Sequence, residues 1–485
     1  MANPSLGNSL GVAVTIPYNV RAGQQRVVAS DTVATPVMVY GATSDVQGGL
    51  LTVQSGGAVT GTISFFGAGG EVDDQTGAAN SYRVYGGGGV LRLTGAGASA
   101  TFANTQNDWD SVYGDGVSLT LQGAQVNVYG GNDVVTVSRS EDDCVSLYGA
   151  ASQWNTVQGD GGLAVLASGN ASVLGASHTI YAAAGSWLSL YGTDSGADQV
   201  SANSTYVILN AASANVTGGG NAFFTNGSCA LALSGTAGNW DGVFGSGGAV
   251  VLNDAQAALF GGNQTVTATA GSWMSLFATA GRPDSVTASG ANIILNDAAA
   301  SVTGGGDLIY TTGACALTLN GTAGAWDTVR GSGADIVATQ AQVSIFGGAN
   351  DVAASHSVIS LYATGAAPDR VTGANNCLTL TDAAATLTGA NDSVYLFGDS
   401  ALTLLGGAVA IYADAHYGDS SLAGFAPSDV LHLSASQWPD FATLLASGAL
   451  AQNGADTTLH LDASHLLTLK NVTETNLTTA QFAFG

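Results

Sequence analysis

Residues 110–148 contain five short apolar segments: Asp110-Ser-Val-Tyr113, Val117-Ser-Leu-Thr-Leu121, Val126-Asn-Val128, Val134-Val-Thr-Val137 and Val145-Ser-Leu-Tyr148. In these segments apolar residues recur with a period of two, which is the pattern of a half-buried β-strand. Glycine, asparagine, aspartate and serine occupy the gaps between them, as tight turns require. The stretch therefore predicts short β-strands separated by turns.

The same pattern recurs along the chain. The motif Asp-x-Val, with Asn once in place of Asp, returns every 42 to 45 residues, at Asp110, Asn155, Asp198, Asp241, Asp284, Asp327 and Asp369. Strands this short cannot bury a face alone, but stacked repeats of them can. We therefore predict an all-β fold, a parallel β-solenoid with a repeat of about 43 residues.

The complete repeat is twice as long. Cysteine and tryptophan alternate at intervals of 42 to 44 residues, at Cys144, Trp187, Cys229, Trp273 and Cys315. Five strands per unit is an odd number, so in a coil of two strands successive units begin on opposite faces. We predict two strands and about 17 residues per coil; a three-sided coil is the alternative.

The same geometry bears on the cysteines. Cysteines 86 residues apart would be separated by about 24 Å, which is too far for a disulfide. We expect buried thiols, with bridges between molecules as the alternative.

Composition and charge exclude several functions. The chain has 34 acidic and 9 basic residues, a net charge of −25, and charged residues are only 9% of the total. A nucleic-acid partner requires a basic surface, so this class is excluded. No apolar run approaches the roughly 20 residues of a membrane span, and no N-terminal secretion signal is visible before Val20.

The C-terminal region has its own pattern. It contains Asp429-Val-Leu-His-Leu433, an apolar insert Phe441-Ala-Thr-Leu-Leu445, Gly454-Ala-Asp-Thr-Thr-Leu-His-Leu-Asp462, Leu466-Leu-Thr-Leu-Lys-Asn-Val472 and the ending Phe482-Ala-Phe-Gly485. This ensemble resembles the secretion region of RTX-type (hemolysin-type) proteins, which leave the cell through type I secretion machinery. The resemblance implies export without a cleaved N-terminal signal, and folding outside the cell with Ca²⁺. The alternative is a β-rich cap that closes the solenoid, and the two roles are compatible.

The RTX resemblance also bears on metal binding. RTX repeats hold Ca²⁺ between turns of the pattern G-G-x-G-x-D-x-U-x, and four glycine-rich turns here match it in fragments, with candidate ligands Asp133, Asp307, Asp351 and Asp392. The Asp-x-Val motif returns too rarely to supply the six to eight oxygens that Ca²⁺ prefers, and its aspartates fit a turn-capping role instead.

No catalytic motif is present. His178 and His356 are isolated, Asp414-Ala-His416 is one acid–imidazole pair without a neighbouring nucleophile, and neither Gly-x-Ser-x-Gly nor His-Glu-x-x-His occurs. Trp240 and Trp326 could stack on sugars, but repeated aromatic residues more often pack in a core or cover a corner. We therefore expect a protein that is not an enzyme.

These observations predict a secreted extracellular structural protein that assembles with copies of itself into filaments or a surface layer, with Ca²⁺ as a possible link. The alternative is a monomeric adhesin or biofilm-matrix protein that binds glycans or a cell surface, and a β-helical polysaccharide-active enzyme is a third. We expect residues 1–100 to form a β-rich arm and the first coils, 101–415 the repetitive solenoid, and 416–485 the secretion-like region or cap.

Overall fold

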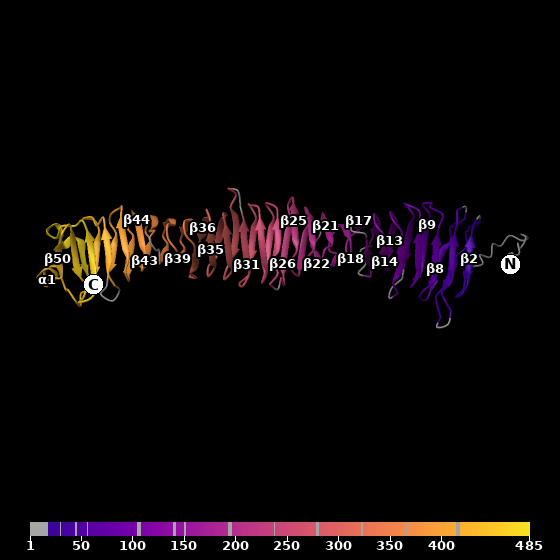
Figure 1. Ribbon diagram of the computed structural model, residues 1–485, viewed down its shortest axis with the longest axis horizontal. Coiled ribbons are helices and arrows are strands. Elements are labelled where there is room, and N and C mark those ends of the chain that lie inside the picture. The colour runs from indigo at the N-terminus through magenta and orange to yellow at the C-terminus, as the bar shows by residue number, and fades with distance from the viewer. Residues whose placement is uncertain are drawn as a thin grey trace, which may run out of the picture. The chain divides into compact units, whose positions relative to one another are not determined.

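The computed structural model describes residues 18–29, 31–43, 46–55, 57–103, 108–138, 142–149, 152–192, 196–236, 238–277, 281–321, 324–363, 367–413 and 418–485. They divide into two compact units. Unit 1 comprises the described residues up to Thr217 together with Asn221–Phe224, and unit 2 comprises Gly218–Gly220 and Thr225–Gly485. Short strands stacked side by side dominate each unit (Figure 1). Strand β25 (Ala222–Asn226) contains the division between the units.

Unit 1 is a parallel β-solenoid with two sheets. Its first two coils carry a third short strand each, β3 (Thr32–Val33) and β6 (Ala58–Val59), and later coils have two strands. Sheet A contains β1 (Tyr18–Val20), β4 (Val37–Tyr40), β7 (Thr62–Phe66), β9 (Ser81–Gly87), β11 (Ser99–Ala103), β13 (Ser118–Gln122), β15 (Val134–Thr136), β17 (Trp154–Gln158), β19 (Asn170–Leu174), β21 (Trp187–Tyr191) and β23 (Tyr206–Asn210). Sheet B contains β2 (Gln25–Val28), β5 (Leu50–Val53), β8 (Glu71–Asp74), β10 (Val90–Leu93), β12 (Asp110–Tyr113), β14 (Gln125–Tyr129), β16 (Cys144–Tyr148), β18 (Leu163–Ser168), β20 (Thr179–Ala182), β22 (Asp198–Ala202) and β24 (Ser213–Thr217).

Unit 2 has the same construction. Sheet A contains β27 (Asp241–Phe244), β29 (Gln256–Phe260), β31 (Trp273–Phe277), β33 (Asn292–Asn296), β35 (Leu308–Thr312), β37 (Asp327–Arg330), β39 (Gln342–Phe346), β41 (Val358–Tyr362), β43 (Cys377–Thr381), β45 (Ser393–Phe397), β47 (Ala410–Ala413), β49 (Val430–Leu433) and β53 (Phe482–Phe484). Sheet B contains β26 (Ala230–Ser234), β28 (Ala249–Asn253), β30 (Thr265–Ala268), β32 (Asp284–Ala288), β34 (Ala299–Thr303), β36 (Ala316–Asn320), β38 (Asp335–Thr339), β40 (Asp351–Ser355), β42 (Asp369–Ala374), β44 (Ala384–Ala390), β46 (Ala401–Leu404), β48 (Ser420–Ala423) and the cap strands given below.

These pairings confirm the parallel solenoid and the two-strand coil. They also confirm that successive 43-residue units begin on opposite sheets. In unit 1, Asp110 and Asp198 lie in sheet B, whereas Asn155 lies in sheet A. In unit 2, Asp241 lies in sheet A and Asp284 in sheet B. The alternation of cysteine with tryptophan follows from this odd number of strands.

The core of each unit lies between its two sheets. Inward positions hold valine, leucine, isoleucine and alanine, as at Leu276 and Ile293, which are fully buried. Glycines in the turns allow successive coils to stack closely. At Gly304, with φ of +124°, an added Cβ would lie 1.6 Å from the carbonyl oxygen of Ala288 in the preceding coil. Gly347 repeats this position one unit later, at 2.0 Å from the carbonyl oxygen of Gly331, so close backbone packing explains the glycine-rich turns.

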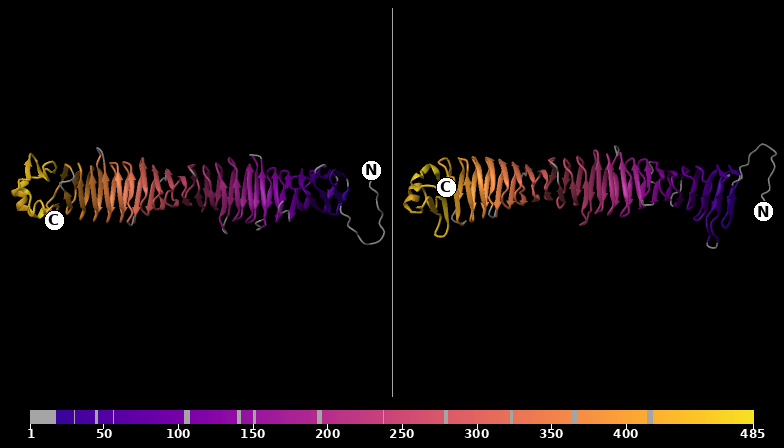
Figure 2. Two further views of the ribbon diagram at one scale, coloured as in Figure 1. Left: turned by 90° about the horizontal axis from the view of Figure 1, so that it is seen from below. Right: turned by 45° about the horizontal axis from the view of Figure 1, so that its top comes forward.

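A β-rich cap closes the C-terminal end of unit 2, as predicted (Figure 2). Strand β52 (Leu466–Lys470) pairs in parallel with β48. Strands β51 (Asp456–His460) and β50 (Leu450–Asn453), which precede β52 in the chain, extend the sheet beyond it as antiparallel strands. Helix α1 (Phe441–Ala446) begins at Asp440, whose side chain accepts the Thr443 N–H, and it buries Leu444 against the cap. Two 3₁₀ turns, Glu474–Asn476 and Thr479–Gln481, precede β53.

The four cysteines all lie in described strands or turns and form no disulfide, and three of them are buried, which agrees with the expectation of buried thiols. None of the described helices has the length and hydrophobicity that a membrane-crossing helix needs.

Candidate functional site

The first polar feature is a row of buried aspartate and asparagine side chains at the N-terminal ends of strands, which we name the inner ladder. In unit 2 the Ala291 N–H donates to Asp307 Oδ1 at 2.8 Å, and the Asp307 N–H donates to Asp327 Oδ1 at 3.0 Å. Each bond connects neighbouring coils of one sheet. Unit 1 repeats the arrangement with the Val117 N–H, Asp133 and Asn155, at 3.0 Å for both bonds. The inner ladder thus satisfies backbone N–H groups that lie beyond the strand ends.

The second oxygen of these aspartates has no such partner. Oδ2 is buried and makes no hydrogen bond in Asp110, Asp133, Asp198, Asp284, Asp307, Asp327, Asp369 and Asp392. Burial raises the pKa of Asp110 and of Asp327 to about 7, although backbone N–H groups oppose the shift: that of Gly89 at Asp110, and those of Asp307 and Gly306 at Asp327. The inner ladder therefore contains carboxyl groups that keep their protons to a higher pH than ordinary aspartates do, because burial disfavours the charged form.

The predicted Ca²⁺ candidates do not converge. Asp133, Asp307 and Asp392 belong to the inner ladder and are at most 1% exposed. Each uses Oδ1 to accept a backbone N–H, that of Val117, Ala291 or Asn376. Asp351 lies on the outer face of sheet B, in register between Asp335 and Arg370. Among the described residues, no three acidic, histidine or cysteine side chains gather where a metal ion could be held.

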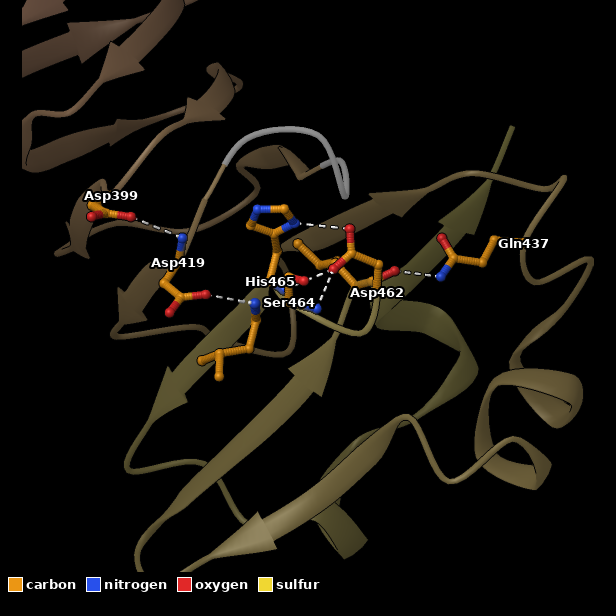
Figure 3. Close-up of polar contacts among 8 residues, drawn as sticks. Asp399, Asp419, Gln437, Asp462, Ser464 and His465 are labelled. Carbon is orange, nitrogen blue, oxygen red and sulfur yellow. Dashed lines mark hydrogen bonds and ion pairs between the residues drawn. The ribbon is translucent and has the colours of Figure 1, made fainter.

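A second ladder of carboxylates lies at the surface near the C-terminal end, and sequence reasoning missed it (Figure 3). The Asp399 N–H donates to Asp382 Oδ1, the Asp419 N–H to Asp399 Oδ1, and the Leu466 N–H to Asp419 Oδ1, each at 3.0 Å. Successive aspartates are 17 and 20 residues apart, which is one coil. A spacing of one coil between aspartates is the sequence signal for this ladder. It does not stand out in the sequence, because it differs from the 43-residue repeat. Asp382, Asp399 and Asp419 are all exposed.

One acid–imidazole pair stands beside the surface ladder, in the turn between β51 and β52 (Figure 3). Asp462 Oδ1 accepts the N–H groups of Ser464 and His465 at 2.6 and 2.8 Å, and Asp462 Oδ2 lies 2.8 Å from His465 Nδ1. The hydrogen bond from His465, aided by those N–H groups, lowers the pKa of Asp462 to about 2. Gln437 Nε2 donates to the Leu461 carbonyl and ties the turn to the chain before α1. Since Asp462 is used to hold the turn, the pair has a structural role.

Two further histidines of the described residues, His178 and His356, each have a polar partner. His178 is 1% exposed, and Asp198 Oδ1 accepts its backbone N–H at 2.9 Å and lies 3.0 Å from its Nδ1. This pair occupies the inner ladder and is sealed from solvent. His356 contacts the neighbouring Ser355 hydroxyl at 2.9 Å. The predicted Asp414–His416 pair lies outside the described residues.

Aromatic side chains gather on the outer face of sheet A in unit 2. Phe244, Phe260 and Phe277 form one stack with 4.7 Å between ring centroids, and Tyr395 and Tyr412 form another at 4.5 Å. A depression of about 390 Å³ lies beside the second stack. Trp240 and Trp326, before β27 and β37, are 37% and 42% exposed, so the expectation that they pack in the core was wrong.

The fold defines the class of protein: a parallel β-solenoid repeat protein with a two-strand coil and a C-terminal cap. No protein-family model and no curated protein matches the chain.

Replacing Asp307 by asparagine is expected to stabilise the protein at pH 7.5, by about 1–3 kcal/mol, the range for relieving an unsatisfied buried group. Asparagine keeps the oxygen that accepts the Ala291 N–H. Its amide can donate to a carbonyl 19 residues earlier, as Asn350 does to Gly331 at 3.4 Å and Asn221 to Ala202 at 3.1 Å. Urea unfolding curves will measure the change. Asp307→Ala is the contrasting variant. It leaves the Ala291 N–H without an acceptor and is expected to destabilise the protein. Equal effects of both variants would contradict the role of the ladder.

Proposed function

We propose that the protein is a secreted extracellular structural protein, a rigid acidic β-solenoid that assembles with copies of itself into filaments or a surface layer. The observation that carries this proposal is how side chains are distributed in the repeat. The inward positions of the coils hold the apolar core and the inner ladder. Its outer positions form straight rows of like side chains, as in the stacked rings of sheet A. Such rows suit repetitive contacts better than they suit one reaction centre.

We propose no catalytic role. The two acid–imidazole pairs among the described residues support this view, since one is sealed in the core and the other holds an exposed turn. Export through type I secretion machinery, without a cleaved N-terminal signal, is supported by the resemblance of the C-terminal region to RTX proteins. We place the protein outside the cell or at its surface for that reason.

Ca²⁺ enters the proposal as a link between molecules. The net charge of −25 makes copies of the chain repel one another, so a divalent cation between exposed carboxylates would favour assembly. Asp382, Asp399 and Asp419 are the best placed of these carboxylates, with Asp335 and Asp351 on the outer face of sheet B. The buried candidates Asp133, Asp307 and Asp392 are not suited to this role.

Electron microscopy of the purified full chain tests the proposal, first with about 10 mM Ca²⁺, roughly ten-fold above the ~1 mM dissociation constant of the weakest extracellular sites, and then with excess chelator. We expect regular fibres or sheets with Ca²⁺ that disperse on chelation. Mg²⁺ at the same ionic strength is the control, because it screens charge equally. Isolated particles under all conditions would contradict the structural role.

A single-molecule adhesin is the second candidate, and the exposure of Trp240 and Trp326 supports it. Isolated particles that are retained by polysaccharide would move the function to glycan or surface binding.

A further inference from the structure

Unit 2 presents two very different outer faces. The outward positions of strands β27 to β49 in sheet A, which we name the aromatic face, hold Phe244, Phe260, Trp273, Phe277, Tyr310, Phe346, Tyr362, Tyr395, Phe397 and Tyr412. The outward positions of β26 to β48 in sheet B carry no aromatic residue and are mostly threonine, serine and alanine. The repeat alone does not require this segregation, because both sheets stack through the same backbone bonds.

Charge is distributed in the same unequal way. No outward position of the aromatic face carries a carboxylate, although the chain has 34 acidic residues. The two aspartates in these strands, Asp241 and Asp327, point into the core and are fully buried. The single basic residue of the face, Arg330, lies with its guanidinium 4.8 Å from the centroid of the Phe346 ring. Exposed Asp382 borders the face beside Tyr362 and Phe397. In a chain of net charge −25, the strands of this face are nevertheless a surface on which two copies can approach with little like-charge contact.

The orientation of the rings selects the partner. The Phe244, Phe260 and Phe277 rings are nearly parallel, with interplanar angles of 6° and 11°, and Phe346 and Tyr362 lie at 9°. Each ring covers the face of its neighbour, so ring edges and tips point away from the sheet. A sugar binds an aromatic residue through the open face of the ring, which these stacks do not offer. Edges and tips spaced at one strand interval match a second sheet with the same interval, and sheets pack face to face at about 10 Å.

The size of the face fits such a contact. Twelve strands at about 4.8 Å extend about 53 Å, and a five-residue strand adds a width of about 15 Å. The product is about 800 Å², which is the area that each partner buries in a standard stable interface of about 1,600 Å² in total.

We propose that the aromatic face of unit 2 is a self-association surface that packs against the same face of a second copy. This inference rests on the proposed structural function and names its first contact. Because the same patch is used twice, the pair has two-fold symmetry and closes as a dimer. Growth into filaments then requires a different contact, which is the role that we give to the Ca²⁺-linked carboxylates.

Sedimentation velocity of the full chain in chelator, over a hundred-fold range of protein concentration, tests the dimer. The double variant Phe260→Thr/Phe346→Thr replaces two rings with the residue type that sheet B carries. The matched control is Thr267→Ser/Thr303→Ser on the outer face of sheet B. We expect dimers for the wild type and the control, and at least a hundred-fold weaker dimerisation for the aromatic variant, with unchanged far-ultraviolet circular dichroism.

The single variants Phe260→Lys and Thr267→Lys provide a second matched pair. The first adds a positive charge to the aromatic face, and the second adds the same charge to the outer face of sheet B. Only the lysine on the aromatic face is expected to produce monomers. A monomeric wild type, or equal dimerisation by the variants of both faces, would overturn the inference. Fibres built from monomers would leave the structural function standing and remove the aromatic face from it. If the wild type forms dimers that the aromatic variants abolish, but forms no fibres under any condition, the aromatic face stands as a self-association surface and the filament function is contradicted.

Discussion

Lowering the pH from 8 to 5 is expected to raise the midpoint of thermal unfolding by several degrees. The fold gains on the order of several kcal/mol, and about 1 kcal/mol shifts the midpoint of a chain of this length by about 1 °C. The cause is the inner ladder. Burial raises the pKa of Asp133, Asp284 and Asp369 to about 6, and that of Asp110 and Asp327 to about 7, against an ordinary value of 3.8. The folded chain therefore holds protons that the unfolded chain releases.

The direction follows from linkage. Where the folded state binds more protons than the unfolded state, stability falls as the pH rises. The contribution is fully present below about pH 4 and is lost as the pH rises through 6 to 7. One carboxyl shifted from 3.8 to about 6 corresponds to about 3 kcal/mol, since each pKa unit is about 1.4 kcal/mol. Asp74, Asp440, Asp456 and Asp462 have lowered pKa values and reverse the trend only below about pH 4.

Calorimetry at pH 5, 6, 7 and 8 measures the effect, and salt supplies the control. Repulsion among exposed carboxylates also weakens as the pH falls, but 0.5 M NaCl screens it, whereas buried groups are screened much less. We expect most of the pH dependence to persist in high salt. A midpoint that is constant, or that rises from pH 5 to 8 in high salt, would show that the buried carboxyl groups are not held protonated.

The change of starting face was predictable by counting. In a two-strand coil, five strands per 43 residues place successive units on opposite sheets, as Asp241 in sheet A and Asp284 in sheet B demonstrate. The count alone did not exclude a three-sided coil, and the first two coils carry a third short strand. The C-terminal cap was predictable from its change of pattern after Pro427. The division near residue 217 was not, because no change in composition or repeat marks it.

The burial of the aspartates was missed although a signal existed. In Asp-x-Val the two residues are two positions apart on a strand and share a face. Since Val329 packs in the core, Asp327 must point inward as well. By residue type alone, aspartate at a strand end indicates a turn residue, and this indication hides the inward direction. The exposure of Trp240 follows from the same rule, because it precedes the inward Asp241 by one position.

Replacing Asp74 by asparagine is expected to destabilise the protein by about 3–5 kcal/mol, the range for breaking a buried, fully bonded charge. Asp74 is as deeply buried as Asp307 but has every lone pair used. Oδ1 accepts the N–H and hydroxyl of Thr76 at 2.9 and 2.7 Å, and Oδ2 accepts from Asn80 Nδ2 at 2.9 Å and from the Tyr82 hydroxyl at 2.7 Å. Burial would raise the pKa of Asp74, but these hydrogen bonds outweigh it and hold the pKa below its usual value. Asparagine must turn its amide N–H groups toward two of those donors.

Asp74→Asn and Asp307→Asn therefore make the same isosteric change at buried sites and are expected to shift stability in opposite directions. Urea unfolding at pH 7.5 compares them directly, and Tyr82→Phe, which removes one of the four donors, is expected to cost about 1–3 kcal/mol. If both asparagine variants stabilise the protein, or both destabilise it, the proposed difference between a fully hydrogen-bonded and a partly unsatisfied buried carboxylate is contradicted. If the signs differ, the number of donors around a buried carboxylate, rather than its burial, decides whether the solenoid gains or loses stability from the charge.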